Sequence, residues 1–206
     1  MGAGRTEIAR AIYGLDQYDS GEIWIQAQEK TLDSPKKAIK NGMGYVSEDR
    51  KGWGFIPRMS LKHNISLTHL PHYAKRGWVQ TKSEAEAVEK MVNDLKIKAA
   101  SINQQVTYLS GGNQQKAVIG RVLLASPKIV ILDEPTRGVD VGAKFEIYKL
   151  INQLTNSGIA VVMISSELPE ILGMSDRVLV LSKGKQTALL SKQEATQETI
   201  MRYAVH

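Results

Sequence analysis

Apolar residues recur along the chain at two spacings, and these predict helices that alternate with strands. Spacings of three and four residues predict helices over Thr6–Tyr13, Asn113–Ala125 and Phe145–Thr155. Short apolar runs predict strands, the longest being Ile129–Leu132 and Ile159–Ile164. Because these two runs are apolar at nearly every position, they are typical of parallel strands covered on both faces. The pattern favours an α/β fold with a mostly parallel sheet flanked by helices.

The middle of the chain has a different pattern. Weaker runs predict strands at Glu22–Ile25 and Met43–Ser47, but residues 58–108 show only helical spacings and loops. Ser83 and Glu86 predict a capping box that opens a helix. The apolar positions of that helix share one face: Ala85, Val88, Met91, Val92 and Leu95. We therefore expect a helical subdomain, approximately residues 58–125, inserted into the α/β core.

Length, charge and composition exclude some classes of protein and of functional site. A length of 206 residues fits one domain. The net charge of +6 suits an anionic partner such as phosphate, nucleic acid or a membrane face, without choosing among them. The chain has no cysteine, which excludes a disulfide framework, a thiolate zinc site and a cysteine nucleophile. Its apolar runs fall far short of the roughly 20 residues of a membrane-spanning helix.

Two adjacent carboxylates, Asp133 and Glu134, follow the run Ile129–Leu132. A buried strand would deliver Asp133 to the carboxyl edge of a sheet, where ligands of α/β proteins bind. A carboxylate there can hold Mg²⁺ directly or through water. Glu134 would then be placed to polarise a water for attack on phosphorus. On this pair alone, the alternative is an acidic turn that merely ends a strand.

A second group of small residues, Ser110, Gly111 and Gly112, precedes the helix predicted at Asn113–Ala125. Ser110 can cap that helix, and the glycines leave backbone N–H groups bare for an anion at the positive end of the helix dipole. A common Gly-Gly loop with a capping serine is the alternative for this tripeptide alone. A predicted strand that ends in Asp133 follows this tripeptide along the chain, and the two features together disfavour a plain Gly-Gly loop.

The start of the chain matches the last five positions of the phosphate-binding loop G-x-x-x-x-G-K-[ST] through Gly2, Ala3, Gly4, Arg5 and Thr6. Thr6 retains the hydroxyl that would bind Mg²⁺. Arg5 stands where lysine is expected, and its wide planar fork is no equivalent of a compact ammonium. A flexible chain end is the alternative for this motif alone.

Taken together, four motifs resemble those of ATP-binding cassette (ABC) ATPases. They occur in the family's order: Gly2–Thr6, Ser47–Lys51, Leu109–Lys116 and Leu132–Asp140. More narrowly, essentially the whole chain resembles the C-terminal nucleotide-binding half of the tandem ATPase subunit of bacterial monosaccharide importers. The resemblance implies a P-loop NTPase-like fold. Residues 1–206 would form a nucleotide-binding domain that lacks its N-terminal strands, because the first glycine of the loop and its feeding strand would precede Met1.

The resemblance also implies roles for individual residues. Asp133 corresponds to the Walker B aspartate, a metal ligand together with Thr6, and Glu134 to the glutamate that orients water. Asp140 belongs to the loop between two sites. The signature contacts the γ-phosphate of an ATP held by an opposing domain, and its residues are Ser110, Gly111, Gly112 and Gln114.

Three positions depart from the general family pattern but are usual for this C-terminal half. Arg5 replaces lysine, Glu48 stands in place of a glutamine, and Ser166 stands in place of the switch histidine, which counts among the catalytic positions. Each change weakens the same nucleotide site, while the Ser110–Gly112 cradle is complete. We therefore hypothesise that this domain has a poor ATP site of its own and donates its signature to a partner.

The implied function is ATP hydrolysis with Mg²⁺ that energises sugar import, weak or absent in the isolated chain. The implied partners are a second nucleotide-binding domain, transmembrane permease subunits and, indirectly, a sugar-binding protein, with no nucleic acid. The implied location is the cytoplasmic face of the bacterial inner membrane. A non-catalytic or vestigial nucleotide-binding fragment stays open as an alternative. So does a soluble ABC ATPase acting on nucleic acid, although the chain shows no coiled coil, zinc module or basic arm.

Overall fold

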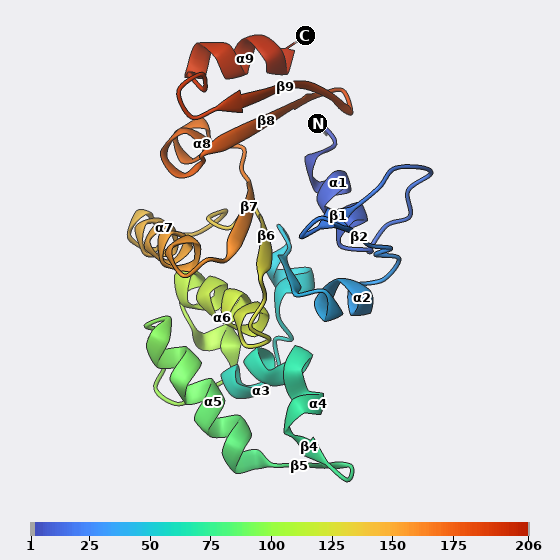
Figure 1. The fold of residues 1–206 in the computed structure, drawn as a ribbon. Coiled ribbons are helices and arrows are strands. Elements are labelled where there is room, and N and C mark those ends of the chain that lie inside the picture. Colours follow the sequence, from blue (N-terminus) through green and yellow to red (C-terminus); the bar gives the residue numbers. More distant parts are fainter. Residues whose placement is uncertain (1–2, 206) are drawn as a thin grey trace. The chain divides into compact units, whose positions relative to one another are not determined.

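The computed structural model describes residues 3–205, which fall into two compact units (Figure 1). The first unit combines the chain up to Asn41 with the chain from Met163 onward. The second unit is Gly42–Val162. No helix within residues 3–205 is both long enough and apolar enough to cross a lipid bilayer.

A parallel sheet forms the centre of the second unit. Strand β3 (Met43–Val46) pairs in parallel with β6 (Ile129–Asp133), and the strand order continues to β7 (Ala160–Ile164). These bounds confirm three predicted strands to within one or two residues. β6 is almost fully buried, as expected, but Val162 of β7 is 51% exposed. Every residue of β7 is exposed or only partly buried, so the strand lacks the double covering that its continuous apolar run suggested.

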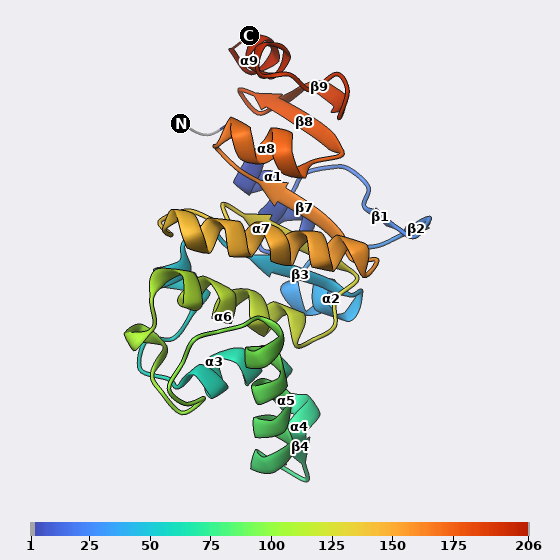
Figure 2. The same cartoon turned by 90° about the vertical axis from the view of Figure 1, so that its left-hand side faces the viewer.

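Two long helices accompany this sheet. Figures 1 and 2 show α6 (Gly111–Leu123) and α7 (Val141–Asn156) running alongside each other. Helix α6 packs closely on β3 because Gly44 has no side chain, and a Cβ there would meet Val122 Cγ1 at 2.1 Å. Both helices were predicted, although α7 begins four residues earlier than expected. Its start is set by Asp140, whose Oδ1 accepts a hydrogen bond from the Ala143 backbone N–H at 2.9 Å.

One further long helix, α5, and several short elements make up the rest of the second unit. They are the π-helical turn Arg50–Gly54, α3 (Leu61–Ser66), the 3₁₀ turn Leu67–His69, α4 (Leu70–Tyr73), β4 (Ala74–Lys75), β5 (Trp78–Val79), α5 (Thr81–Asp94) and the 3₁₀ turn Val106–Tyr108. The segment expected to be helical therefore also contains a small β4–β5 hairpin. The subdomain boundaries at 58 and 125 stay a prediction.

The capping box expected at Ser83 is wrong. Helix α5 begins two residues earlier, and the Ser83 hydroxyl donates to the Gln80 carbonyl at 3.1 Å. Glu84 is buried instead, accepting a hydrogen bond from the Ser66 hydroxyl at 2.6 Å and facing Lys62 Nζ at 3.4 Å. The interior contact with α3 decides the position of α5.

The first unit contains four helices and two hairpins in its described part. They are α1 (Arg5–Ile12), β1 (Trp24–Ile25), β2 (Gln28–Glu29), α2 (Pro35–Lys40), α8 (Leu168–Met174), β8 (Arg177–Ser182), β9 (Lys185–Ser191) and α9 (Gln197–Val205). The helix predicted at Thr6–Tyr13 is confirmed, shifted by one residue. The strand expected at Glu22–Ile25 is reduced to a two-residue edge of a hairpin.

The hairpin of β8 and β9 is the largest element that the sequence reading missed. Its turn, Lys183-Gly184, has φ values of 50° and 76°, the left-handed conformation of a tight hairpin turn. Side chains on one face of the hairpin pack with α8 and α9 around a buried cluster: Val178, Val180, Leu190 and Ile200. The continuous apolar run Val178–Leu181 in β8 was the available signal.

Candidate functional site

The carboxylate Asp133 ends β6 inside the second unit and is fully buried. Tyr45, on the adjacent strand β3, donates from its hydroxyl to Asp133 Oδ2 at 3.1 Å. The parallel register explains the contact, because it sets Tyr45 beside Ile131, two residues before the aspartate. The predicted strand therefore delivers a carboxylate whose orientation is held by a neighbouring phenol.

Glu134 follows directly in an unusual backbone conformation. Its φ is 48°, in the left-handed region that costs an L-residue roughly 1–2 kcal/mol. The Arg137 backbone N–H donates to the Glu134 carbonyl at 3.1 Å and closes the turn. Strain of this kind gathers where a structure must aim a side chain.

The structure pairs Glu48 with Arg137 in an ion pair. Glu48 follows β3, and Arg137 lies in the loop that leads from β6 to Asp140. The sequence reading considered only an orientation of Glu48 toward nucleotide and missed this arginine. The carboxylate thus joins two loops of the second unit, and its role in nucleotide binding stays a prediction.

The signature loop opens α6, as expected, but its polar contacts differ from the expected ones. Ser110 occupies the capping position without capping a backbone N–H, and its hydroxyl accepts from the Asn113 side chain at 2.9 Å. The Gln114 amide turns inward and donates to the Leu109 carbonyl at 3.0 Å. The side chains of Ser110 and Gln114 are thus hydrogen-bonded within the protein, and anion binding by the loop stays a prediction.

The two glycines of the signature are not equivalent. A Cβ on Gly112 would lie 2.4 Å from the Ala143 Cβ on α7. A Cβ on Gly111 would meet nothing closer than 3.5 Å, where the Arg50 guanidinium and the Gly138 carbonyl lie. Gly112 is needed for the close contact of α6 with α7, and Gly111 leaves room at the mouth of the loop.

The loop before α1 belongs to the first unit, and Gly2 lies outside the described residues. Gly4 has a φ of 90° at the start of the helix, and the Ala3 carbonyl accepts from the Gly184 N–H at 3.2 Å. Arg5 Nη1 donates to the Ser165 carbonyl at 2.8 Å. The arginine that replaces the expected lysine is therefore bonded to protein backbone. Thr6 lies in the first turn of α1.

Ser166 follows β7 on the exposed surface of the first unit. Its neighbour Ser165 is buried and donates to Glu170 Oε2 at 2.6 Å, while it accepts from the Glu167 N–H at 3.0 Å. Ser165 and Glu170 were not predicted, because a single serine after a strand carries no distinctive pattern. They fix the backbone that receives Arg5.

The predicted site residues thus fall in both units. Ala3–Thr6 and Ser166 belong to the first, and within it the Arg5 contact joins α1 to the segment after β7. The remainder belong to the second: Glu48, Ser110, Gly111, Gly112, Gln114, Asp133, Glu134 and Asp140. Within the second unit, Glu48 and the 134–140 loop are brought together by Arg137.

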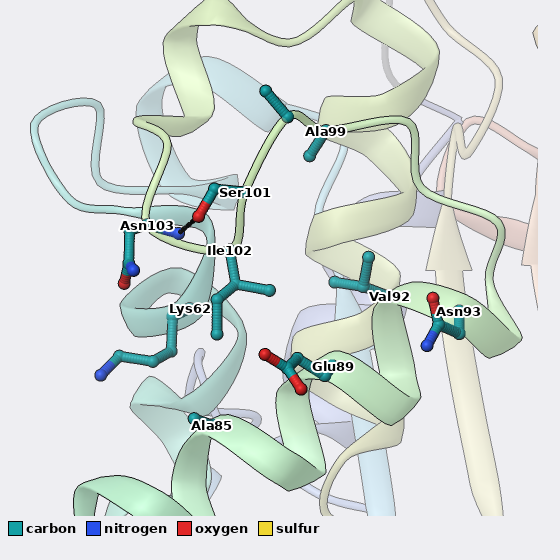
Figure 3. Close-up of a pocket in the computed structure, with 10 residues that line it drawn as sticks. Lys62, Ala85, Glu89, Val92, Asn93, Ala99, Ser101, Ile102 and Asn103 are labelled. Atoms are coloured by element: carbon teal, nitrogen blue, oxygen red, sulfur yellow. Dashed lines mark hydrogen bonds between the residues drawn. The ribbon is translucent and has the colours of Figure 1, made fainter.

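A separate pocket of about 530 Å³ lies in the second unit beside α5 (Figure 3). Its wall includes Lys62, Glu89 and Ile102, and Ser101 accepts a hydrogen bond from the Asn103 N–H at 3.1 Å. None of the predicted site residues lines it. This pocket is therefore not the candidate nucleotide site.

Comparison with protein families decides the classification. The family model described as "ABC transporter" matches residues 1–137, about two thirds of the chain. The chain belongs to the ABC transporter family. It is thus an ABC-type ATPase domain, and the resemblance predicted from its motifs is confirmed.

Curated relatives in this family include two ribose import ATP-binding proteins. Those named RbsA from Bacillus licheniformis and Bacillus subtilis are 52% and 50% identical to the chain over 204 residues. The match covers 99% of this chain but 41% of each relative. The chain therefore spans less than half the length of these relatives.

Solved ABC transporter cassettes share the fold. The cassette MJ1267 superposes with a TM-score of 0.82 at 21% identity, covering 98% of this chain and 83% of that chain. The cassette MJ0796, described as dimeric and bound to ADP and Pi, superposes with a TM-score of 0.78 at 22% identity, covering 93% and 82%. The predicted α/β, P-loop NTPase-like fold is confirmed.

Proposed function

We propose that this domain binds ATP and works in an ATPase that energises sugar import across the bacterial inner membrane. The observation that carries the proposal is the 48–52% identity to ribose import ATP-binding proteins over nearly the whole chain. Its partners would be a second nucleotide-binding domain, permease subunits and, indirectly, a sugar-binding protein. Its place would be the cytoplasmic face of the membrane.

The domain would serve the partner's ATP site through the Ser110–Gly112 loop. Free N–H groups at the start of α6 and the positive end of a 13-residue helix favour an anion there. The signature would meet the γ-phosphate of a nucleotide held by the second domain. Asp140, at the start of α7, would lie between the two sites.

Magnesium fits the oxygen donors available in this domain. Asp133 supplies a buried carboxylate oriented by Tyr45, and Thr6 supplies a hydroxyl. Hard oxygen ligands of this kind are those that Mg²⁺ prefers. When bound, the ion would neutralise charge on the phosphates, and Glu134 would orient the attacking water.

The domain's own site would be degenerate. The Arg5 guanidinium donates to the Ser165 carbonyl, which takes donor capacity away from a phosphate. Glu48 is paired with Arg137 and adds a carboxylate where the family has a neutral amide. Ser166 lacks the reach and the titratable nitrogen of a histidine. These three observations support an asymmetric pair of ATP sites.

Phosphate release tests the proposal. The chain alone is expected to release phosphate slowly, with Glu134→Gln changing the rate little. Robust release by the isolated chain that disappears in Glu134→Gln, but survives in the exposed control Glu198→Gln, would overturn the asymmetry. The absence of any ATP affinity by calorimetry would instead favour the non-catalytic fragment. Stimulation by DNA or RNA would favour the nucleic-acid ATPase.

A further inference from the structure

The turn Arg50–Gly54, which follows Glu48, is built more firmly than a connecting loop requires. Asp49 Oδ1 accepts from the Gly52 N–H at 2.8 Å, and the Asp49 carbonyl accepts from the Trp53 and Gly54 N–H groups at 2.9 and 3.1 Å. A Cβ on Gly52 would lie 2.2 Å from the Asp49 carboxylate. This residue pattern therefore holds Arg50 in one place.

Arg50 reaches from this turn to the signature. Its Nη1 donates to the Gly111 carbonyl at 3.1 Å, and its Nη2 lies 3.5 Å from where a Gly111 Cβ would be. Its Nε is buried and has no hydrogen-bond partner among the residues that the structure describes. Burial lowers the pKa of this guanidinium from its ordinary value, but an arginine stays charged at neutral pH.

A second arginine, Arg121 near the C-terminal end of α6, also bonds the turn Arg50–Gly54. Arg121 Nη2 donates to the Gly54 carbonyl, and Arg121 Nε donates to the Asn64 carbonyl at 3.0 Å. Between them, Gly54 lies against α6, since a Cβ there would be 3.2 Å from Val118 Cγ2. Gly111 and Arg121 are ten residues apart, about 15 Å along a helix. The turn is therefore fixed to the signature helix at two points.

We propose that Arg50 is a positioning residue for the signature. Its guanidinium holds the Gly111 carbonyl, fixes the direction of the backbone N–H groups of the Ser110–Gly112 loop, and places a permanent positive charge behind them. Preorganised donors and fixed charge strengthen the binding of an anion without a cost of reorientation at the moment of binding. This inference rests on the proposed function, in which the loop meets the γ-phosphate of the partner's nucleotide.

The planar fork explains why the position suits arginine. One nitrogen of the guanidinium bonds the Gly111 carbonyl while a second lies over the glycine itself. A lysine would keep the charge but offer a point donor with a different reach. The difference allows charge and geometry to be separated by substitution.

The test compares Arg50→Gln, Arg50→Lys and Arg58→Gln in the assembly that contains this chain and its second nucleotide-binding domain. Arg58 is the matched control, because it is exposed, lies in the same segment and makes no hydrogen bond or ion pair with the described residues. Phosphate release gives KM for ATP, and calorimetry gives Kd for ADP. We expect Arg50→Gln to raise KM for ATP about tenfold, consistent with one lost charge-assisted interaction. We expect Arg50→Lys to recover about half of that loss on a logarithmic scale.

The affinity for ADP separates positioning from general damage. Because the signature meets only the γ-phosphate, Kd for ADP should stay within about twofold of wild type in both Arg50 variants. Equal weakening of ATP and ADP binding, or an Arg50→Gln variant that behaves like Arg58→Gln, would overturn the proposal. If Arg50→Gln does not fold, Arg50→Lys alone carries the test by the same comparison of ATP with ADP.

A reference variant separates this inference from the function on which it rests. Ser110→Arg places a bulky side chain in the cradle and should abolish turnover of the assembly. If it does so while Arg50→Gln matches its control, the inference about Arg50 is wrong and the proposed function stands. If Ser110→Arg leaves turnover unchanged, the donated signature itself is wrong.

Discussion

Two helix starts in this domain use the same ingredients, glycine and arginine, in opposite ways. At α1, Gly4 takes a φ of 90° and Arg5 turns its guanidinium to the Ser165 carbonyl. At α6, the arginine comes from another segment, and Arg50 supports the Gly111 carbonyl from behind. In the first case the cation of the loop is bound by the protein. In the second case the cation bonds a carbonyl of the loop, and this contact does not use the backbone N–H groups of the loop.

The difference teaches that the residue types of a glycine-rich loop do not by themselves specify the contacts that the loop makes. Both loops precede a helix, and the first N–H groups of a helix have no acceptor within the helix itself. What distinguishes them is the direction of the neighbouring guanidinium and the number of contacts that hold the loop. This contrast supports the proposal that one loop serves a partner while the other serves a weakened site.

The largest effect is expected from the two glycines of the signature. Gly112→Ala should lower the free energy of unfolding by about 2 kcal/mol, because its Cβ would lie 2.4 Å from that of Ala143. Gly111→Ala should leave stability unchanged or raise it by a few tenths of a kcal/mol, since its nearest neighbours are at 3.5 Å and alanine favours helix. Urea denaturation measures both. Equal effects at the two positions would contradict the tight contact of α6 with α7.

The regular elements of the fold were predictable because their causes are local or periodic. The strand at 129–132 and the helices at 6–13, 113–125 and 145–155 follow from apolar spacing, and each is present within a few residues. The errors arose where a distant contact overrode a local signal. Burial of Glu84 against Ser66 set the position of α5 and displaced the expected capping box.

The candidate site was predictable in its residue types but not in its contacts. An apolar strand that ends in Asp133 predicts a carboxylate at a sheet edge. Nothing in the sequence predicts that the Tyr45 hydroxyl donates a hydrogen bond to that carboxylate. The pair of Glu48 with Arg137 joins residues far apart in the chain. Contacts of this kind depend on strand register and loop direction, which a single sequence does not specify.

A smaller effect is expected at the start of α1. Gly4→Ala should lower the free energy of unfolding by about 1 kcal/mol, because a φ of 90° disfavours any side chain. A Cβ there would also approach Gly184 Cα at 3.3 Å. Gly173→Ala is the matched control in the same unit, since it lies in α8 with open space around it and should be neutral or stabilising. Equal responses in thermal melts would show that α1 does not depend on its left-handed glycine.

The anchoring of α6 can be tested by pH. The hydrogen bond from buried Lys116, at 2.5 Å, holds the pKa of the Glu146 carboxyl below its ordinary 4.5. A carboxyl whose folded pKa is lowered stabilises the protein above its unfolded pKa, and this stabilisation disappears as pH falls through the folded pKa. Glu146 is half exposed, so Glu146→Gln should cost less than about 1 kcal/mol at pH 7.

Urea denaturation at several pH values checks this expectation. The difference between wild type and Glu146→Gln should be constant above pH 5 and should shrink below pH 4.5, toward the lowered pKa of the folded state. The exposed pair Glu198–Arg202, tested by Glu198→Gln, is the control and should show a smaller difference. A Glu146 difference that persists undiminished in acid would contradict an ionic anchor between α6 and α7.

The smallest effect is expected from restoring the lysine of the phosphate loop. Arg5→Lys removes the bond to the Ser165 carbonyl and supplies the compact ammonium of the general family pattern. Because Glu48 and Ser166 would still weaken the same site, we expect calorimetry to show ATP binding, with Mg²⁺ present, tightened by less than about threefold, or 0.6 kcal/mol. Arg202→Lys, on the exposed face of α9, should change nothing. A tightening of tenfold or more in Arg5→Lys would locate the weakness of the site in the direction of one guanidinium, and the contrast between the two loops would then depend on Arg5 alone.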